Sequence, residues 1–201
     1  MLFSDTYNEI AEDSKATYKE KGSKFISYAF RVYDKNEIKK RIEELKKTEN
    51  GANHYCYAYI LHPDKSMSRF NDDGEPNSTA GRPILKQIEK NELTNILIVV
   101  VRYFGGIKLG IPGLIRCYNT ATINVLENTQ IIKKLIKEKY TILFKHKSIN
   151  HVMQVLKQYN LEILNSNFEV NCKVEFLVPK NISENVLHQL TSDHNIKIHY
   201  I

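Results

Sequence analysis

The chain has 201 residues, and 29 Lys and Arg against 23 Asp and Glu give it a formal net charge of +6. Hydrophobic residues make up 42% and charged residues 26%, a globular composition that excludes a disordered or fibrous chain. The longest aliphatic run, Ile96 to Val101, is far shorter than the ~20 residues that a membrane-spanning helix needs.

The N-terminal residues, Met1 to Asp5, lack the basic start and the apolar core of a secretory signal. The cysteines are Cys56, Cys117 and Cys172, an odd number without C-x-x-C spacing, which excludes a disulfide framework or a zinc cluster. We therefore expect a reduced cytoplasmic protein that does not engage a membrane.

Hydrophobic periodicity and turn residues predict a β-rich start, then alternating helices and strands to about residue 128. The predicted elements, in chain order, are a strand at 25–33, a helix at 35–48, a strand at 54–61, a polar loop at 62–81, a helix at 83–92, a strand at 95–104 that is buried on both faces, a glycine loop at 105–112 and a helix at 113–128.

From Lys139 the pattern restarts, with Ser148 and Ser183 as candidate helix N-caps. The predicted elements are a strand at 140–144, a helix at 148–159, strands at 162–165 and 170–178, a helix at 183–190 and a strand at 196–200. This β-α-β-β-α-β order is the ferredoxin-like plan, and residues 131–139 form the expected hinge. The predicted fold class is α+β with two domains, 1–136 and 137–201.

The positive charge is unevenly distributed. Residues 1–137 carry 22 basic and 17 acidic side chains, whereas the remainder carries 7 and 6. The 34 residues from Leu93 to Leu126 contain no acidic residue, although Arg102, Lys108 and Arg116 lie there. This stretch indicates an anionic partner, or else a solvated basic face.

A polar segment from Asn71 to Pro83 contains three carboxylates within four positions: Asp72, Asp73 and Glu75. Such a group can hold Mg²⁺ together with phosphate oxygens, although it is too small for an EF-hand. The alternative is a rigid polar turn, in which the acids cap neighbouring backbone and Arg82 pairs locally. We assign no metal and no cofactor, and Mg²⁺ stays open as the alternative.

A glycine loop follows the apolar strand and leads into a helix. In this geometry backbone N–H groups can face an anion. The candidate phosphate- or nucleic-acid-binding residues are Arg102, Gly105, Gly106, Lys108, Gly110, Gly113 and Arg116. The spacing matches neither the dinucleotide nor the Walker fingerprint. The alternative is that the glycines let strand and helix pack closely and that Arg102 is a structural charge.

Two further patterns have structural alternatives. His54 and Cys56 suggest a Cys/His nucleophile, but a cysteine on a buried strand usually acts as a small hydrophobe. Tyr55, Tyr57 and Tyr59 share one strand face, which is typical of core or interface packing. No catalytic residue is assigned, and whether the protein is an enzyme stays open, with the balance toward a non-enzyme.

Four motifs make the chain similar to the YigZ/IMPACT family. They are Lys21-Gly22-Ser23-Lys24-Phe25, Asn53-His54-Tyr55-Cys56-Tyr57-Ala58, Asp72-Asp73-Gly74-Glu75-Pro76 with Thr79-Ala80-Gly81-Arg82-Pro83, and Val100-Val101-Arg102-Tyr103-Phe104-Gly105-Gly106-Ile107-Lys108-Leu109-Gly110. The resemblance covers the whole chain and marks Asp72, Asp73, Glu75, Thr79 and Arg82 as motif residues.

The resemblance implies a ribosomal protein S5 domain 2-like N-terminal domain and a ferredoxin-like C-terminal domain. That pair, in that order, is similar to the fourth and fifth domains of elongation factor G, which touch ribosome and RNA. Eukaryotic members restrain an initiation-factor kinase through a co-activator, but they carry an additional RWD domain.

Three functions follow as hypotheses. The first is a non-enzymatic, translation-associated protein that binds RNA or the ribosome through the basic glycine-rich face. The second is a small phosphate-binding enzyme, Mg²⁺-dependent in phosphoryl transfer or hydrolysis, that uses the acidic and glycine loops. The third is an adaptor that docks a protein partner on its tyrosine face or its ferredoxin-like sheet.

Overall fold

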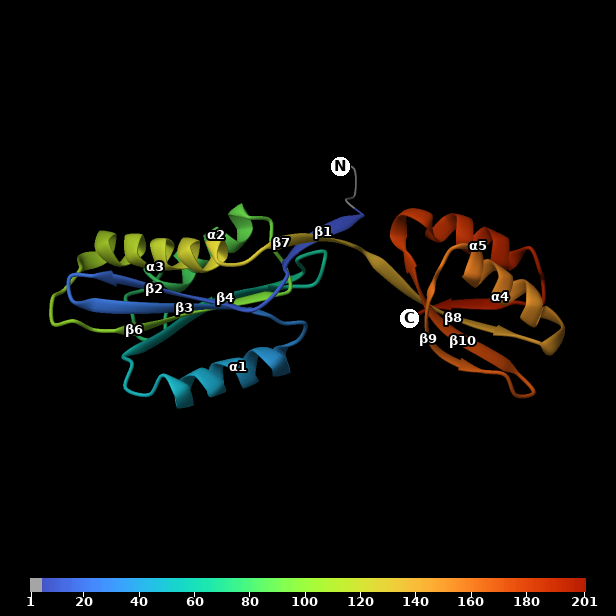
Figure 1. The fold of residues 1–201 in the computed structure, drawn as a ribbon, viewed down its shortest axis with the longest axis horizontal. Coiled ribbons are helices and arrows are strands. Elements are labelled where there is room, and N and C mark those ends of the chain that lie inside the picture. The colour runs from blue at the N-terminus through green and yellow to red at the C-terminus, as the bar shows by residue number, and fades with distance from the viewer. Residues whose placement is uncertain (1–4) are drawn as a thin grey trace. The chain divides into compact units, whose positions relative to one another are not determined.

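The computed structural model describes residues 5–201 and divides the chain into two compact units. The N-terminal unit is Tyr7–Lys134, and the C-terminal unit is Leu135–Ile201 together with Asp5 and Thr6 (Figure 1). Both units combine helices with antiparallel sheet, which confirms the predicted α+β class. Among the described helices, none is both long and apolar enough to cross a bilayer.

The N-terminal unit is built on a five-stranded antiparallel sheet with strand order β2-β3-β6-β4-β5. The strands are β2 (Ser14–Glu20), β3 (Ser23–Arg31), β4 (His54–Leu61), β5 (Met67–Asn71) and β6 (Ile96–Tyr103). The central strand β6 is buried from Ile96 to Arg102, which confirms the predicted strand buried on both faces. The strand is continuously aliphatic because helices cover both sides of the sheet, so neither face of the strand meets water.

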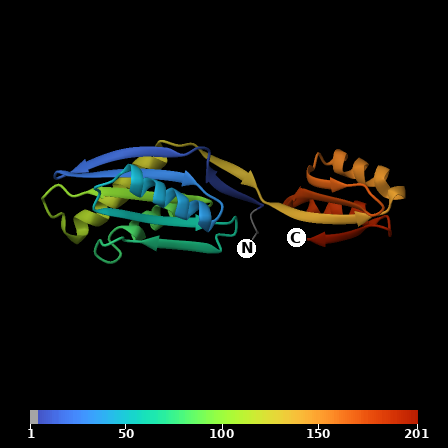
Figure 2. The ribbon, with the colours of Figure 1, turned by 90° about the horizontal axis from the view of Figure 1, so that it is seen from below.

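Helices α2 (Gly81–Lys90) and α3 (Gly110–Glu127) cover one face of this sheet, and α1 (Lys35–Thr48) covers the other (Figures 1 and 2). Alternate residues of β6 therefore enter two different cores: Ile98 and Val100 pack beneath α2 and α3, whereas Leu97 and Val99 pack against α1. The predicted bounds of α1 are confirmed.

Several predicted boundaries differ from the structure by a few residues, and two of the differences bear on the two loops. The predicted loop at 62–81 contains the edge strand β5, whose sequence Met-Ser-Arg-Phe-Asn has too little apolar alternation to signal a strand. Helix α3 begins at Gly110 rather than at 113, because Pro112 is compatible with the first helical turn. The expected hinge at 131–139 contains the division between the two units; it consists of strand β7 (Ile131–Leu135), which pairs with β1 (Thr6–Ile10), and the start of β8 (Lys137–Phe144).

The C-terminal unit has the predicted β-α-β-β-α-β order. Its elements are β8 (Lys137–Phe144), α4 (Ile149–Gln158), β9 (Glu162–Asn167), β10 (Cys172–Pro179), α5 (Ser183–Thr191) and β11 (Lys197–Tyr200). The strand order β11-β8-β10-β9 is antiparallel throughout, and the apolar faces of α4 and α5 share one core with the sheet. The ferredoxin-like plan is confirmed.

The two serines do not cap these helices as predicted. Short 3-10 turns lead into α4 and α5, and neither helix has a side-chain cap. Ser148 donates its hydroxyl to the Asp193 carboxylate instead, and Ser183 donates to the carbonyl of Lys180.

Candidate functional site

The acidic loop after β5 is held by its own carboxylates. Asp72 Oδ1 accepts the backbone N–H groups of Ala80 and Gly81 at 3.0 and 2.8 Å, and its Oδ2 accepts that of Ser78 at 2.9 Å. The Asp72 carboxylate thus occupies the N-terminus of α2, where a negative charge is favourable. Asp73 accepts the N–H of Tyr55 at 2.7 Å. These contacts agree with the rigid polar turn, because backbone groups occupy the carboxylates that a cation would need.

Glu75 lies apart from its two neighbours and forms a buried ion pair. Its Oε1 accepts Arg102 Nη1 at 2.6 Å and the Tyr118 hydroxyl at 2.8 Å. The Glu75 and Arg102 side chains are only 3% and 6% exposed. Burial raises the pKa of Tyr118 well above its usual value, so its hydroxyl stays protonated and donates to the carboxylate. His54 Nε2 lies 3.9 Å from the same oxygen.

The strands explain why these side chains meet. Arg102 pairs with His54 of β4 and with Phe25 of β3 in the sheet register, so β6 delivers the guanidinium between two neighbouring strands. The guanidinium carbon lies 5.5 Å from the ring centres of both Phe25 and Phe104, within cation–π range. Arg102 is therefore buried in an ion pair at the end of the central strand and is not exposed on the surface, which agrees with the structural alternative that the sequence left open.

The glycine loop is pressed against the turn between β2 and β3. A Cβ on Gly105 would overlap the backbone of Gly22, and one on Gly22 would lie 2.8 Å from the Gly105 carbonyl oxygen. Ser23 Oγ accepts the Gly105 N–H at 3.2 Å and so fastens the two segments together. Glycine is required at both positions because the two backbones touch.

A pocket of about 350 Å³ joins the two loops that the sequence singled out. The acidic loop contributes Glu75 and Pro76, and the glycine loop and α3 contribute Lys108 to Ile111 and Leu114. His54, Arg102 and Phe104 complete the lining. Asp72 and Asp73 do not line it, so only Glu75 of the three carboxylates converges with the glycine loop.

The remaining candidates lie in different environments. Lys108 and Arg116 are exposed, and Arg116 pairs with Glu20 at 3.7 Å. Gly106 and Gly110 are exposed, whereas Gly113 is buried in α3 and a Cβ there would lie 3.1 Å from Leu109 Cβ. Gly113 is therefore a packing residue. Thr79 is buried and donates to the carbonyl of Pro76, and Arg82 is exposed.

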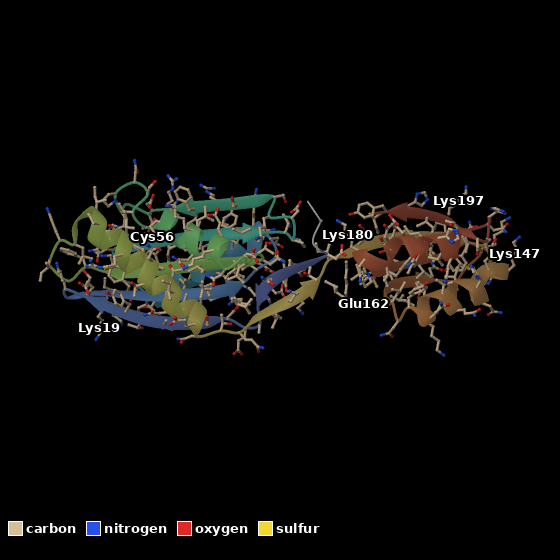
Figure 3. The ribbon with its side chains drawn as sticks, turned by 90° about the horizontal axis from the view of Figure 1, so that it is seen from above. Lys19, Cys56, Lys147, Glu162, Lys180 and Lys197 are labelled. Atoms are coloured by element: carbon tan, nitrogen blue, oxygen red, sulfur yellow. The ribbon has the colours of Figure 1, made fainter. Side chains whose placement is uncertain are left out.

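The structure adds three lysines to the candidate phosphate-binding residues. Lys19, Lys21 and Lys24 are exposed at and beside the turn between β2 and β3, and Lys21 and Lys24 also belong to the first family motif. Because this turn touches the glycine loop, these lysines lie at the same end of the sheet as Lys108 and Arg116. This end is here called the basic tip, and it consists of Lys19, Lys21, Lys24, Lys108 and Arg116. Figure 1 shows both segments at the same end of the sheet, and Figure 3 shows Lys19 projecting outward from β2.

Exposed apolar side chains lie within the same segments. Phe104, Ile107 and Ile111 are 46%, 55% and 58% exposed, and Ile115 follows one helical turn later at 36%. An exposed apolar group rimmed by charge is typical of an interaction site.

Cys56 and the three tyrosines of β4 are packing residues. Cys56 is fully buried, and its Sγ lies 3.3 Å from the Tyr118 hydroxyl. Burial raises its thiol pKa, which opposes formation of a nucleophilic thiolate. Tyr59 is buried, with Tyr55 and Tyr57 packed beside it, in the core beneath α1. Within residues 5–201 no group of three His, Cys, Asp or Glu side chains is placed to hold a metal ion.

Comparisons with known proteins agree with these motifs. The Impact N-terminal domain family matches residues 21–126. The IMPACT family member YvyE of Bacillus subtilis is 39% identical over 120 residues, which span 59% of this chain and 55% of that protein. An IMPACT family member of Haemophilus influenzae is 33% identical over 179 residues, 86% of this chain and 83% of that protein.

Among solved structures, a crystal structure of an hypothetical protein superposes with a TM-score of 0.78 at 26% identity, covering 99% of this chain and 98% of that one. The fold of both units is thus shared over their whole length. The domain match, the relatives and the motifs around the Glu75–Arg102 pair together show that the chain belongs to the IMPACT (YigZ) family.

Proposed function

We propose that this protein binds RNA, alone or within the ribosome, through the basic tip, in a non-catalytic role associated with translation. The observation that carries the proposal is the contact between Gly22 and Gly105, because it joins the lysines of one turn to the acid-free glycine loop. Five cations then lie at one end of the sheet, and the two segments contribute a single carboxylate, Glu20.

The charges of the basic tip are suited to phosphate. Lys19, Lys21, Lys24 and Lys108 are exposed, and none of them forms an ion pair within residues 5–201. Lysines in this state bind phosphates as mobile point charges, and each contact releases condensed counterions. Arg116 is the exception, since Glu20 partly neutralises it.

The apolar side chains of the tip favour RNA with unpaired bases over a regular duplex. Phe104 is 46% exposed beside the glycine loop, and bases of single-stranded nucleic acid stack on such rings. Exposed backbone at Gly106 allows a phosphate to approach closely.

The test is co-sedimentation of the full chain with purified ribosomes, beside binding to a single-stranded RNA, at ~50 mM and ~200 mM salt. We expect binding at the lower salt concentration that weakens strongly at the higher one. Absence of binding to both ribosomes and RNA at ~50 mM salt would refute the proposal, since phosphate contacts are strongest there. Salt-insensitive binding to ribosomes would also contradict it and would favour a protein partner.

A further inference from the structure

The pocket between the acidic and glycine loops is a second feature of this end of the N-terminal unit. It shares Phe104 and Lys108 with the segments proposed to bind RNA, but the phosphate contacts of the other lysines do not involve it. Its volume of about 350 Å³ lies at the lower end of the range of small-molecule sites. Apolar side chains form much of its wall, among them Phe104, Leu109, Ile111 and Leu114. A ligand of matching chemistry would have an apolar body.

The first polar feature of the pocket is the N-terminus of α3. Gly110 and Ile111, the first two residues of this 18-residue helix, both line the pocket. Their N–H groups precede the intrahelical hydrogen bonds, the helix has no side-chain cap, and its first turn has no acidic residue. The positive end of the helix dipole is thus left uncompensated by the protein.

The second polar feature is independent of the helix. Arg102 lines the same pocket and is 95% buried, since 5% of its surface is exposed, yet its Nε has no hydrogen-bond partner within residues 5–201. A buried donor without an acceptor is costly, and native proteins rarely leave one without a reason. Arg102 Nη1 donates to Glu75 and Nη2 donates to Ser23 Oγ at 3.5 Å, so Nε is the guanidinium nitrogen that lacks an acceptor in the described residues.

The charges around the pocket decide which ligand fits. Glu75 is its one carboxylate and is already paired with Arg102, while Lys108 stands at the pocket without an ion-pair partner in the described residues. The uncompensated charge is therefore positive. We propose that this pocket binds a small organic anion that carries one carboxylate or phosphate group on an apolar body.

The test is a titration of the full chain followed by the backbone amide NMR signals of Gly110, Ile111 and Gly113. The probes are phenyl phosphate, phenylacetate, inorganic phosphate and the neutral benzyl alcohol. We expect saturable shifts at these amides with phenyl phosphate, phenylacetate or both, and a Kd of about 1 mM or lower. The organic anion that binds more tightly identifies the phosphate or the carboxylate as the preferred group.

Three results would overturn the proposal: no saturation by either organic anion up to about 10 mM, inorganic phosphate binding as tightly as phenyl phosphate, or benzyl alcohol binding as tightly as the anions. The first result would exclude a binding site, the second would exclude a role for the apolar body, and the third would exclude a role for the negative charge.

Two matched variants test whether the ligand binds in the pocket. Ile111 lines the pocket and Ile115, one turn further along α3, does not, while both side chains are exposed and tolerate a polar residue. We expect Ile111→Glu to weaken the tighter probe by about tenfold or more, because it adds a negative charge at the pocket, and Ile115→Glu to change it less than about twofold. Equal weakening by both variants would contradict binding in the pocket.

Discussion

Replacing Glu75 by glutamine should destabilise the N-terminal unit strongly. The substitution keeps the size of the side chain and an oxygen that can accept the Tyr118 hydroxyl, but it removes the charge that faces Arg102 at 2.6 Å. Both partners are almost fully buried, so water cannot replace the lost carboxylate. Removing one partner of a buried ion pair typically costs about 3–5 kcal/mol. Because the amide retains an acceptor, we expect a loss of about 3 kcal/mol.

The matched control is Glu20→Gln. Glu20 pairs with Arg116 at 3.7 Å, but these side chains are 27% and 64% exposed. Solvent screens such a pair, and its loss should cost about 0.5 kcal/mol or less. The comparison thus varies burial while keeping the chemistry of the substitution constant.

The assay is urea unfolding followed by hydrogen exchange and mass spectrometry, since the chain has no tryptophan to report by fluorescence. Peptides from β6 report the N-terminal unit, and peptides from β10 report the C-terminal unit as an internal control. With a urea dependence of about 1.5 kcal/mol per M, Glu75→Gln should lower the β6 midpoint by about 2 M. A β6 midpoint no lower than that of Glu20→Gln would refute the buried-pair reasoning.

Three further predictions follow from other contacts. Gly105→Ala should lower the free energy of unfolding by about 3 kcal/mol, because its Cβ enters the neighbouring backbone. Gly106 has a φ of +84° and open space around it, so Gly106→Ala should lower that free energy by only about 1 kcal/mol. Equal urea midpoints for the two variants would contradict this difference. Iodoacetamide should modify Cys56 only after urea unfolds the N-terminal unit, because burial raises the thiol pKa, and rapid labelling of the native chain, seen by mass spectrometry, would contradict this. The hydrogen bond from Ser148 holds the pKa of Asp193 well below its usual value, so its contribution to the C-terminal unit is present above about pH 4 and is lost at lower pH. Urea midpoints measured between about pH 5 and about pH 2 should fall less steeply in Asp193→Asn, and an unchanged pH dependence would refute the assignment.

The secondary structure could be predicted where the local sequence pattern is strong. Helix α1 could be read from Ile38, Ile42 and Leu45 at helical spacing, and the Asp34 carboxylate accepts the N–H groups of the first turn. Strand β6 could be predicted from its aliphatic run, because a short run rich in β-branched residues is typical of a strand covered on both faces. The edge strand β5 could not, since its stability comes from pairing with β4 rather than from its own pattern.

The candidate site was predictable in its residues but not in its contacts. The sequence located the acidic and glycine loops, yet it could not show that Glu75 pairs with Arg102 or that Gly22 touches Gly105. These contacts join residues far apart in the chain, and single-sequence periodicity reports only neighbours. The lysines of the β2–β3 turn were missed for the same reason. Lys21 and Lys24 belonged to a quoted motif, but nothing in the spacing connected them with Lys108.

The central claim is that the basic tip contacts RNA phosphates. The most direct measurement is the salt dependence of RNA binding by the triple variant Lys21→Glu/Lys24→Glu/Lys108→Glu, beside a triple variant with the same charge change at Lys39, Lys40 and Lys86, exposed lysines on α1 and α2. If each tip lysine neutralises one phosphate of single-stranded RNA, the slope of log K against log salt should become shallower by about 2 in the tip variant and stay unchanged in the control. Equal slopes for the two triple variants would contradict the claim.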